Sequence, residues 1–197
     1  MNSVCVFCGS RPGQSRQFIE TARALGRTLA EKNQTLVYGG ANVGLMGAVA
    51  DAALERGGTV VGVIPRFLQE KEVAHPGLTE LILCETMHER KMKMFELSQG
   101  FVALPGGFGT LEEVIEVLTW HQLGIHSYPV AFLNVNGFYN HLRRFFDEME
   151  QALFLTPTSK RMALFCDSIP ELFREMESYQ AFDVKHGIPK KGTPSLT

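Results

Sequence analysis

Three glycine-rich segments of this sequence suggest where the chain could bind a small anion. They cover residues 8–13, 39–47 and 105–110. Because glycine tolerates positive φ and lacks a Cβ, the backbone N–H groups of such a segment can converge on one small anion. A helix-like stretch follows the third segment, and the free N–H groups and dipole of a helix start favour a phosphate. Each glycine could instead serve only a tight turn of the chain.

The common nucleotide fingerprints do not fit these segments. The sequence has no G-x-G-x-x-G followed by an acidic residue about 20 positions later, which disfavours a dinucleotide site. It also has no G-K-[S/T], so the lysine and the Mg²⁺ ligand of a P-loop kinase are missing. A single phosphate group, bound without hydride or phosphoryl transfer, therefore suits the segments better.

Thr110 and Glu113 have the spacing of a capping box at the start of a helix. In that interpretation Thr110 caps the helix, Glu113 reaches back to the Thr110 N–H group, and Glu112 is a solvated neighbour. The Glu113 carboxylate could instead act as a catalyst. The two interpretations compete for one side chain.

Arg90 is a second charged group with an informative neighbourhood. At helical spacing it shares a face with apolar residues such as Met87 and Met94. A guanidinium on a largely apolar face needs an anionic partner, because an unpaired buried charge is costly. The alternative is that Arg90 extends to solvent while Lys91 and Lys93 form a hydrated face.

The chain has four cysteines, and Cys5 and Cys8 form a C-x-x-C pair. A zinc site needs a second pair of ligands, which the sequence does not offer. The pair also lies within an apolar run, where residues three apart in a strand point to opposite faces. We therefore expect buried, reduced thiols and no metal.

Short apolar runs alternate with helix-like stretches along the chain, which predicts an α/β fold. The expected strands cover residues 4–8, 35–38, 59–64, 81–84, 101–104, 130–135 and 163–166. The expected helices cover residues 16–32, 45–56, 88–98, 111–123, 138–152 and 170–178. Residues 66–79 lack a clear period and are expected to cover the site as a loop or short helix. Strands that are apolar on both faces predict a parallel sheet between two helical layers. Residues 1–179 would form one domain, and residues 180–197 a flexible tail.

The composition narrows the classes of partner. The chain of 197 residues is 45% hydrophobic and carries 19 Lys and Arg against 21 Asp and Glu, a net charge of −2. A protein that binds nucleic acid or anionic lipid usually has a basic excess, so both partners are disfavoured. No run approaches the ~20 apolar residues of a membrane span, and no signal peptide is recognisable. We expect a cytoplasmic protein.

Residues 105–113 match the P-G-G-x-G-T-x-x-E motif of the LOG (Lonely Guy) family. These proteins are cytokinin riboside 5′-monophosphate phosphoribohydrolases, many of which were formerly labelled lysine decarboxylases. The Arg90-Lys91 pair lies upstream of the motif as it does in that family. Residues 4–10, 38–47 and 120–126 also resemble the family. The resemblance covers the chain from about residue 3 to residue 178.

The resemblance implies a Rossmann-like homodimer that hydrolyses the N-glycosidic bond of adenosine 5′-monophosphates, including N6-modified ones. Free base (cytokinin or adenine) and ribose 5-phosphate would be released, without a metal or redox cofactor.

The family's site residues can be carried over position by position. The resemblance implies that Arg90 and Glu113 are catalytic and also contact the substrate. It implies that Gly107, Gly109 and Thr110 bind the phosphate. The remaining implied substrate contacts are Glu72, Lys91, Phe108, Leu111, Glu112 and Thr119. Phe108 fills the variable position of the motif.

Two other functions stay open at this stage. A P-G-G-x-G-T turn could hold a phosphorylated ligand in a binding module that does not cleave it. A lysine decarboxylase would need pyridoxal phosphate on a Schiff-base lysine, and no motif marks such a lysine. The residues that recognise the base are also open, because Met87, Met92, Met94 and Trp120 could line a pocket or belong to the core.

Overall fold

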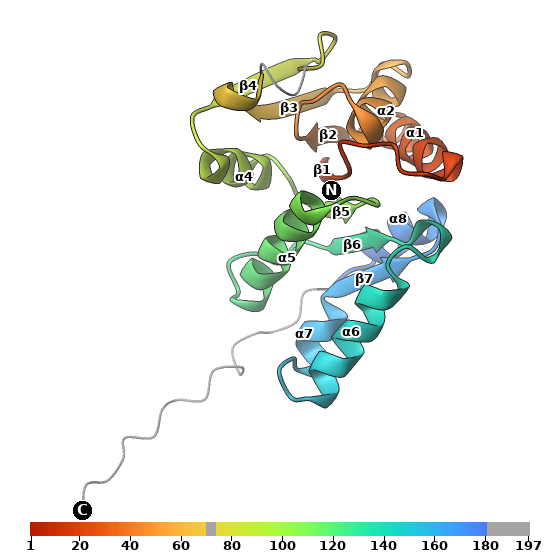
Figure 1. The fold of residues 1–197 in the computed structure, drawn as a ribbon, viewed down its shortest axis with the longest axis vertical. Coiled ribbons are helices and arrows are strands. Elements are labelled where there is room, and N and C mark those ends of the chain that lie inside the picture. The colour runs from red at the N-terminus through yellow and green to blue at the C-terminus, as the bar shows by residue number, and fades with distance from the viewer. Residues whose placement is uncertain (70–73, 181–197) are drawn as a thin grey trace, which may run out of the picture.

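The computed structural model describes residues 1–69 and 74–180 of the chain. Its centre is a parallel sheet of seven strands in the order β4-β3-β2-β1-β5-β6-β7 (Figure 1). The strands are β1 (Ser3–Phe7), β2 (Thr35–Tyr38), β3 (Val60–Pro65), β4 (Glu80–Cys84), β5 (Phe101–Ala103), β6 (Val130–Leu133) and β7 (Ala163–Cys166). The predicted α/β class with a central parallel sheet is confirmed.

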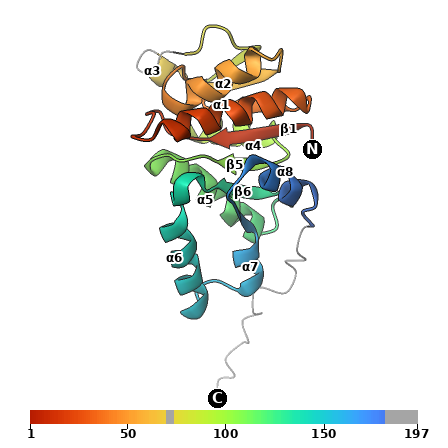
Figure 2. The ribbon, with the colours of Figure 1, turned by 90° about the vertical axis from the view of Figure 1, so that its right-hand side faces the viewer.

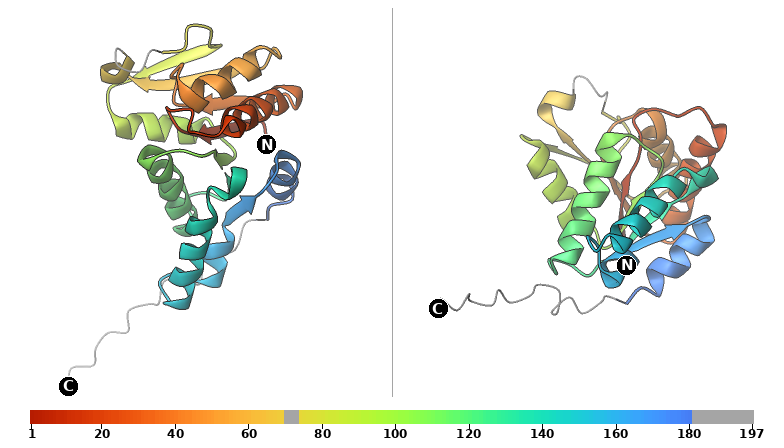
Figure 3. Two further views of the ribbon diagram at one scale, coloured as in Figure 1. Left: turned by 45° about the vertical axis from the view of Figure 1, so that its right-hand side comes forward. Right: turned by 60° about the horizontal axis from the view of Figure 1, so that its bottom comes forward.

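Helices cover both faces of the sheet. They are α1 (Arg16–Glu31), α2 (Gly44–Leu54), α3 (Arg66–Gln69), α4 (Met87–Glu96), α5 (Phe108–Gln122), the 3₁₀ turn η1 (Val135–Gly137), α6 (Asn140–Gln151), α7 (Pro157–Arg161) and α8 (Ile169–Glu177). Helices α1, α2 and α8 pack on one face, and α4, α5 and α6 pack on the other (Figure 3). Helices α6 and α7 lie at the end of the molecule opposite α3 and β4 (Figures 1 and 2). The result is a three-layer, Rossmann-like sandwich.

The central strand β1 shows why the runs lack polar alternation. Its residues Val4 and Val6 pack in the core beneath α1 and α2, whereas Phe7 packs in the core beneath α4 and α5. Cys5 and Cys8 likewise belong to opposite cores, as predicted, and both are free thiols. Burial, with a smaller contribution from Glu113, raises the pKa of both thiols, so the neutral form is favoured.

The predicted elements differ from the observed ones mainly at short or interrupted helices. One helix over residues 138–152 was expected, but α6 begins only at Asn140, after the 3₁₀ turn η1, in which Asn136 and Gly137 have positive φ. Helix α7 was not expected, although Thr156 caps it and Pro157 opens it. Residues 66–79 include the short helix α3, while residues 70–73 lie outside the described part. The division into a domain and a tail stays a prediction.

The strand order reverses between β1 and β5, which places a crevice at the carboxyl ends of these two strands. The three glycine-rich segments follow β1, β2 and β5, which are neighbours in the sheet. They touch through the backbone, because the Gly9 N–H donates to the Pro105 carbonyl at 3.1 Å and the Leu45 N–H donates to the Gly9 carbonyl at 3.0 Å. The sheet therefore brings all three segments to one place.

Candidate active site

Helix α5 starts inside the third glycine-rich segment. Gly107 is its N-cap residue with extended backbone angles, and no side chain caps the helix. The predicted capping box is therefore wrong, since Thr110 already lies in the first turn and is buried. A Cβ on Gly106 would lie 2.1 Å from Thr110 Oγ1, so the glycine lets Thr110 pack against the turn. Because Gly107 is the N-cap residue, Glu113 does not hold the N3 position that a capping box requires.

The first turn of α5 presents backbone donors to open space. The first N–H groups of a helix have no acceptor within the helix, and the dipole adds partial positive charge there. A Cβ built on Gly107 or Gly109 would meet no other described atom within 4 Å. Phe108 between them is 95% exposed. This geometry suits an anion that approaches the start of α5.

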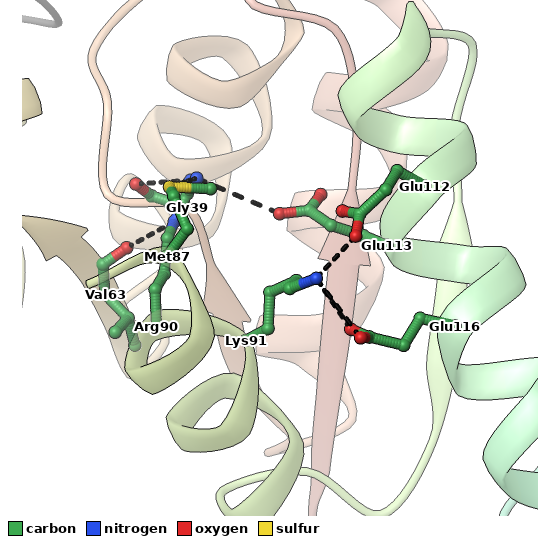
Figure 4. Close-up of polar contacts among 8 residues, drawn as sticks. All are labelled: Gly39, Val63, Met87, Arg90, Lys91, Glu112, Glu113 and Glu116. Atoms are coloured by element: carbon green, nitrogen blue, oxygen red, sulfur yellow. Dashed lines mark hydrogen bonds and ion pairs between the residues drawn. The ribbon is translucent and has the colours of Figure 1, made fainter.

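Arg90 and Glu113 face each other beside this turn, from α4 and α5 (Figure 4). Arg90 Nη1 lies 3.9 Å from Glu113 Oε1, and the two side chains are only 9% and 13% exposed. The prediction that Arg90 pairs with an anion is confirmed, and the alternative that it extends to solvent is wrong. The pair places a carboxylate and a guanidinium at the carboxyl end of the sheet.

Backbone carbonyls hold the guanidinium in place. Arg90 Nε donates to the Val63 carbonyl at 3.1 Å, and Nη2 donates to the Gly39 carbonyl at 3.2 Å (Figure 4). A Cβ on Gly39 would lie 2.1 Å from Nη2. A side chain at position 39 would therefore displace the guanidinium from the place in which it is held here. Sequence reasoning assigned Gly39 to an anion-binding turn and missed this role.

Lys91 bridges α4 and α5 next to the pair. Its ammonium donates to Glu112 and also lies 3.1 Å from Glu116 Oε2 (Figure 4). Burial lowers the pKa of Lys91, but the bonds to Glu112 and Glu116 outweigh burial and raise it overall. Its side chain is 11% exposed, so the predicted hydrated face is wrong for Lys91, although Lys93 is more exposed. Glu112 is partly solvated, as expected, but it is also an ion-pair partner.

Three further residues were predicted to contact the substrate. Thr119 lies further along α5, where its exposed hydroxyl donates to the Ile115 carbonyl at 2.8 Å. Leu111 is half-buried and packs against the core beneath α5. Glu72 lies outside the described residues. The substrate contacts implied for these three residues stay predictions.

The methionine and tryptophan residues divide between core and surface. Met94 is buried beneath α4, and Trp120 packs edge-on against Phe95 with ring centroids 5.0 Å apart. Both therefore have core contacts. Met92 is exposed, so it belongs to the surface of α4.

The fold and the crevice define a Rossmann-like α/β protein in which a helix start and an acidic side chain flank the same space. A family model described as "Possible lysine decarboxylase" matches residues 46–176. Curated relatives match most of the chain. This chain belongs to the LOG family of cytokinin riboside 5′-monophosphate phosphoribohydrolases.

Two relatives illustrate the match. The chain is 44% identical over 177 residues to cytokinin riboside 5′-monophosphate phosphoribohydrolase LOG5 of Arabidopsis thaliana, covering 90% of this chain and 78% of the relative. It is 48% identical over 168 residues to cytokinin riboside 5′-monophosphate phosphoribohydrolase of Rhodococcoides fascians, covering 85% of each.

Among solved structures, the Moco carrier protein of Chlamydomonas reinhardtii has a TM-score of 0.68 at 20% identity, over 89% of this chain and 94% of that chain. The molybdenum cofactor binding protein of Rippkaea orientalis has a TM-score of 0.65 at 21% identity, over 89% and 95%. At this identity the two structures support the fold alone.

Proposed function

We propose that this protein hydrolyses the N-glycosidic bond of adenosine 5′-monophosphates, including N6-modified ones. The products are the free base and ribose 5-phosphate. The names of relatives that are 43–48% identical support this reaction. The structural observation that carries the proposal is the Arg90–Glu113 pair beside the open first turn of α5.

The phosphate is the handle of the substrate in this proposal. The N–H groups of Gly107, Phe108, Gly109 and Thr110 lie at the N-terminal end of α5, where the helix dipole favours an anion. Binding energy from the phosphate then fixes the ribose relative to Glu113, which lies one helical turn after Thr110. The start of the helix and the carboxylate act on two ends of one sugar phosphate.

Cleavage of the bond between C1′ and the base nitrogen passes through an oxocarbenium-like transition state. The bonding electrons leave with the base, which takes up a proton from solvent to become the neutral free base, while a water oxygen adds to C1′. An ionised Glu113 stabilises the positive charge on the ribose and accepts a proton from the attacking water. Glu113 is therefore the proposed catalytic carboxylate.

Arg90 is the proposed partner of that carboxylate. Its guanidinium stays charged at all ordinary pH values, so it does not serve as a proton donor. The positive charge favours the ionised form of a neighbouring carboxylate. Since the Val63 and Gly39 carbonyls fix two of its nitrogens, Nη1 is held toward Glu113. Arg90 thus orients Glu113 and contributes charge at the site.

We also propose that the protein is a homodimer. Exposed apolar side chains on α4 and α5, including Met92 and Ile115, support an interface on this side of the molecule, as does the resemblance to the family. Sedimentation equilibrium should give twice the chain mass. A single chain mass at micromolar concentration would contradict the dimer.

The reaction is tested by product analysis with AMP and N6-isopentenyl AMP side by side. The wild-type protein should release a free base and ribose 5-phosphate from at least one of them. Glu113→Gln should abolish most of this release, whereas Glu96→Gln on the exposed surface of α4 should not change it. Tight binding of both nucleotides without any free base would favour the binding module instead. Carbon dioxide released from lysine with added pyridoxal phosphate would favour the decarboxylase.

A further inference from the structure

Tyr139 supports the glycine-rich turn before α5 from inside the protein. Its side chain is 2% exposed, and its hydroxyl donates to the Leu104 carbonyl at 2.7 Å. Leu104 is the residue between β5 and Pro105, where the chain leaves the sheet and enters the turn. Burial raises the pKa of the Tyr139 phenol well above its usual value, so the hydroxyl remains a donor.

The backbone of this turn is held from two sides. The Leu104 N–H donates to the Phe7 carbonyl at 2.9 Å, which continues the pairing of β5 with β1. The Pro105 carbonyl accepts from the Gly9 N–H at 3.1 Å. The Leu104 carbonyl lies between these two bonds and points to Tyr139 instead of a strand. Its orientation therefore fixes the peptide plane from which residues 105–110 start.

Tyr139 is itself held by a saturated polar network. Asn134 Oδ1 accepts from the Tyr139 N–H at 2.7 Å. Both Asn134 Nδ2 bonds are used, because they reach Asn140 Oδ1 and Asp167 Oδ1 at 2.9 Å each. The Tyr139 ring also packs edge-on against Phe132, with centroids 5.1 Å apart. The hydroxyl is thus positioned before any ligand arrives.

We propose that Tyr139 is a positioning residue that keeps the 105–110 turn in the shape in which its N–H groups bind a phosphate. It acts through the Leu104 carbonyl and does not touch the ligand. The phosphate part of this inference rests on the proposed function. The resemblance to the family did not point to Tyr139, because the residue lies outside the matched motif.

Tyr139→Phe removes the hydroxyl and keeps the ring. Tyr38→Phe is a matched control, since Tyr38 is fully buried at the end of β2 and its hydroxyl has no hydrogen-bond partner among the described residues. Amide hydrogen exchange of residues 104–110 should become about fivefold faster in Tyr139→Phe, the effect of one lost hydrogen bond. Exchange of the same residues should not change in Tyr38→Phe.

Calorimetry then measures the binding of ribose 5-phosphate and of adenosine. Tyr139→Phe should weaken the binding of ribose 5-phosphate about fivefold and leave adenosine, which has no phosphate, unchanged. A merely structural role would weaken both ligands alike. Unchanged exchange and affinity in Tyr139→Phe, or equal losses in Tyr38→Phe, would overturn the inference.

A second variant and the wild-type protein separate the test of Tyr139 from the test of the proposed function. Asn140→Ala removes one support of Asn134 and should give a smaller change in the same direction, which replaces Tyr139→Phe if that variant folds poorly. If the wild-type protein releases no ribose 5-phosphate from nucleotides and does not bind it, the proposed function fails, and the hydrogen exchange of residues 104–110 alone decides whether Tyr139 positions the turn.

Discussion

The two ends of α5 stabilise buried polar side chains in opposite ways. At its N-terminal end, Arg90 and Glu113 carry opposite charges, and two carbonyls accept from the guanidinium. At its C-terminal end, His121 is buried among rings, with His126 at 4.9 Å and Tyr179 at 5.7 Å between centroids. One end is built around charges and the other around neutral rings.

Burial decides the state of the histidine end. His121 Nδ1 has no hydrogen-bond partner within the described ranges, and Nε2 lies 3.4 Å from the Tyr179 hydroxyl. Burial, followed by the neighbouring His126, lowers the pKa of His121 to about 4. The imidazole is therefore neutral near pH 7. A buried side chain stays charged where the fold supplies groups that compensate the charge. The N-terminal end of α5 supplies such groups, so it is the end that offers ionic chemistry.

The largest expected effect is loss of turnover in Glu113→Gln. The substitution keeps the shape of the side chain and removes its charge and basicity, so kcat should fall by about 10²-fold or more. Binding of AMP should change by less than about threefold, since the phosphate contacts remain. Steady-state kinetics and calorimetry measure the two quantities. Wild-type turnover would remove Glu113 from the mechanism.

Arg90→Lys tests whether the charge alone is enough at this end. Lysine cannot reach the Val63 and Gly39 carbonyls and Glu113 at once, so kcat/KM should fall by roughly 30-fold.

Gly39→Ala tests the same geometry without changing the arginine. The alanine Cβ would displace Arg90 Nη2, so kcat/KM should fall, as it should in Arg90→Lys. Gly57→Ala is not a suitable control, because Gly57 has positive φ and alanine would be strained there. Gly107→Ala is not suitable either, because Gly107 belongs to the site. Full activity in both Arg90→Lys and Gly39→Ala would show that the position of the guanidinium is unimportant.

The histidine end should affect stability and its dependence on pH, but not catalysis. The unfolded chain binds a proton on His121 near pH 6.5, and the folded chain binds it only near pH 4. The free energy of unfolding should therefore fall as the pH drops between these values, by about 2 kcal/mol from pH 7.5 to pH 5.

Urea unfolding at both pH values measures this loss. His121→Gln should reduce the difference, whereas His141→Gln on the exposed start of α6 should keep it. An unchanged difference in His121→Gln would show that other groups cause the acid sensitivity.

The smallest expected effect concerns the bridge between α4 and α5. Lys91→Met removes a largely buried ammonium that joins Glu112 and Glu116, and should reduce stability by about 1 kcal/mol. Lys93→Met is the control, since the ion pair of Lys93 within the described residues is with Glu96 at 3.8 Å, on the exposed side of α4. Thermal unfolding compares the two variants. Equal midpoints would show that Lys91 does not stabilise the pair of helices.

The sheet and the meeting of the glycine-rich segments were predictable from local pattern. Runs such as residues 35–38 are apolar on both faces, and parallel strands place all the following turns at one edge. The resemblance to the family named Arg90 and Glu113 as site residues. The structure places these two side chains opposite each other, while their catalytic roles stay proposals.

Contacts between distant residues could not be predicted from one sequence. Arg90 donates to a backbone carbonyl 51 residues away, and Tyr139 donates to one 35 residues away. Every residue has a backbone carbonyl, so the residue types do not indicate which one is used. The start of α5 was misplaced because Thr110 is a good capping residue, whereas Gly107 caps without a side chain. Lys91 looked solvated because its acidic partners lie on another helix.

In the proposed mechanism, the turn before α5 holds a 5′-phosphate and so brings the ribose to Glu113. A crystal structure of the Glu113→Gln variant soaked with AMP tests it most directly. We predict the phosphate against the N–H groups of residues 107–110, with C1′ beside residue 113, directly or across one water. A phosphate bound elsewhere, or a ribose turned away from residue 113, would contradict the claim.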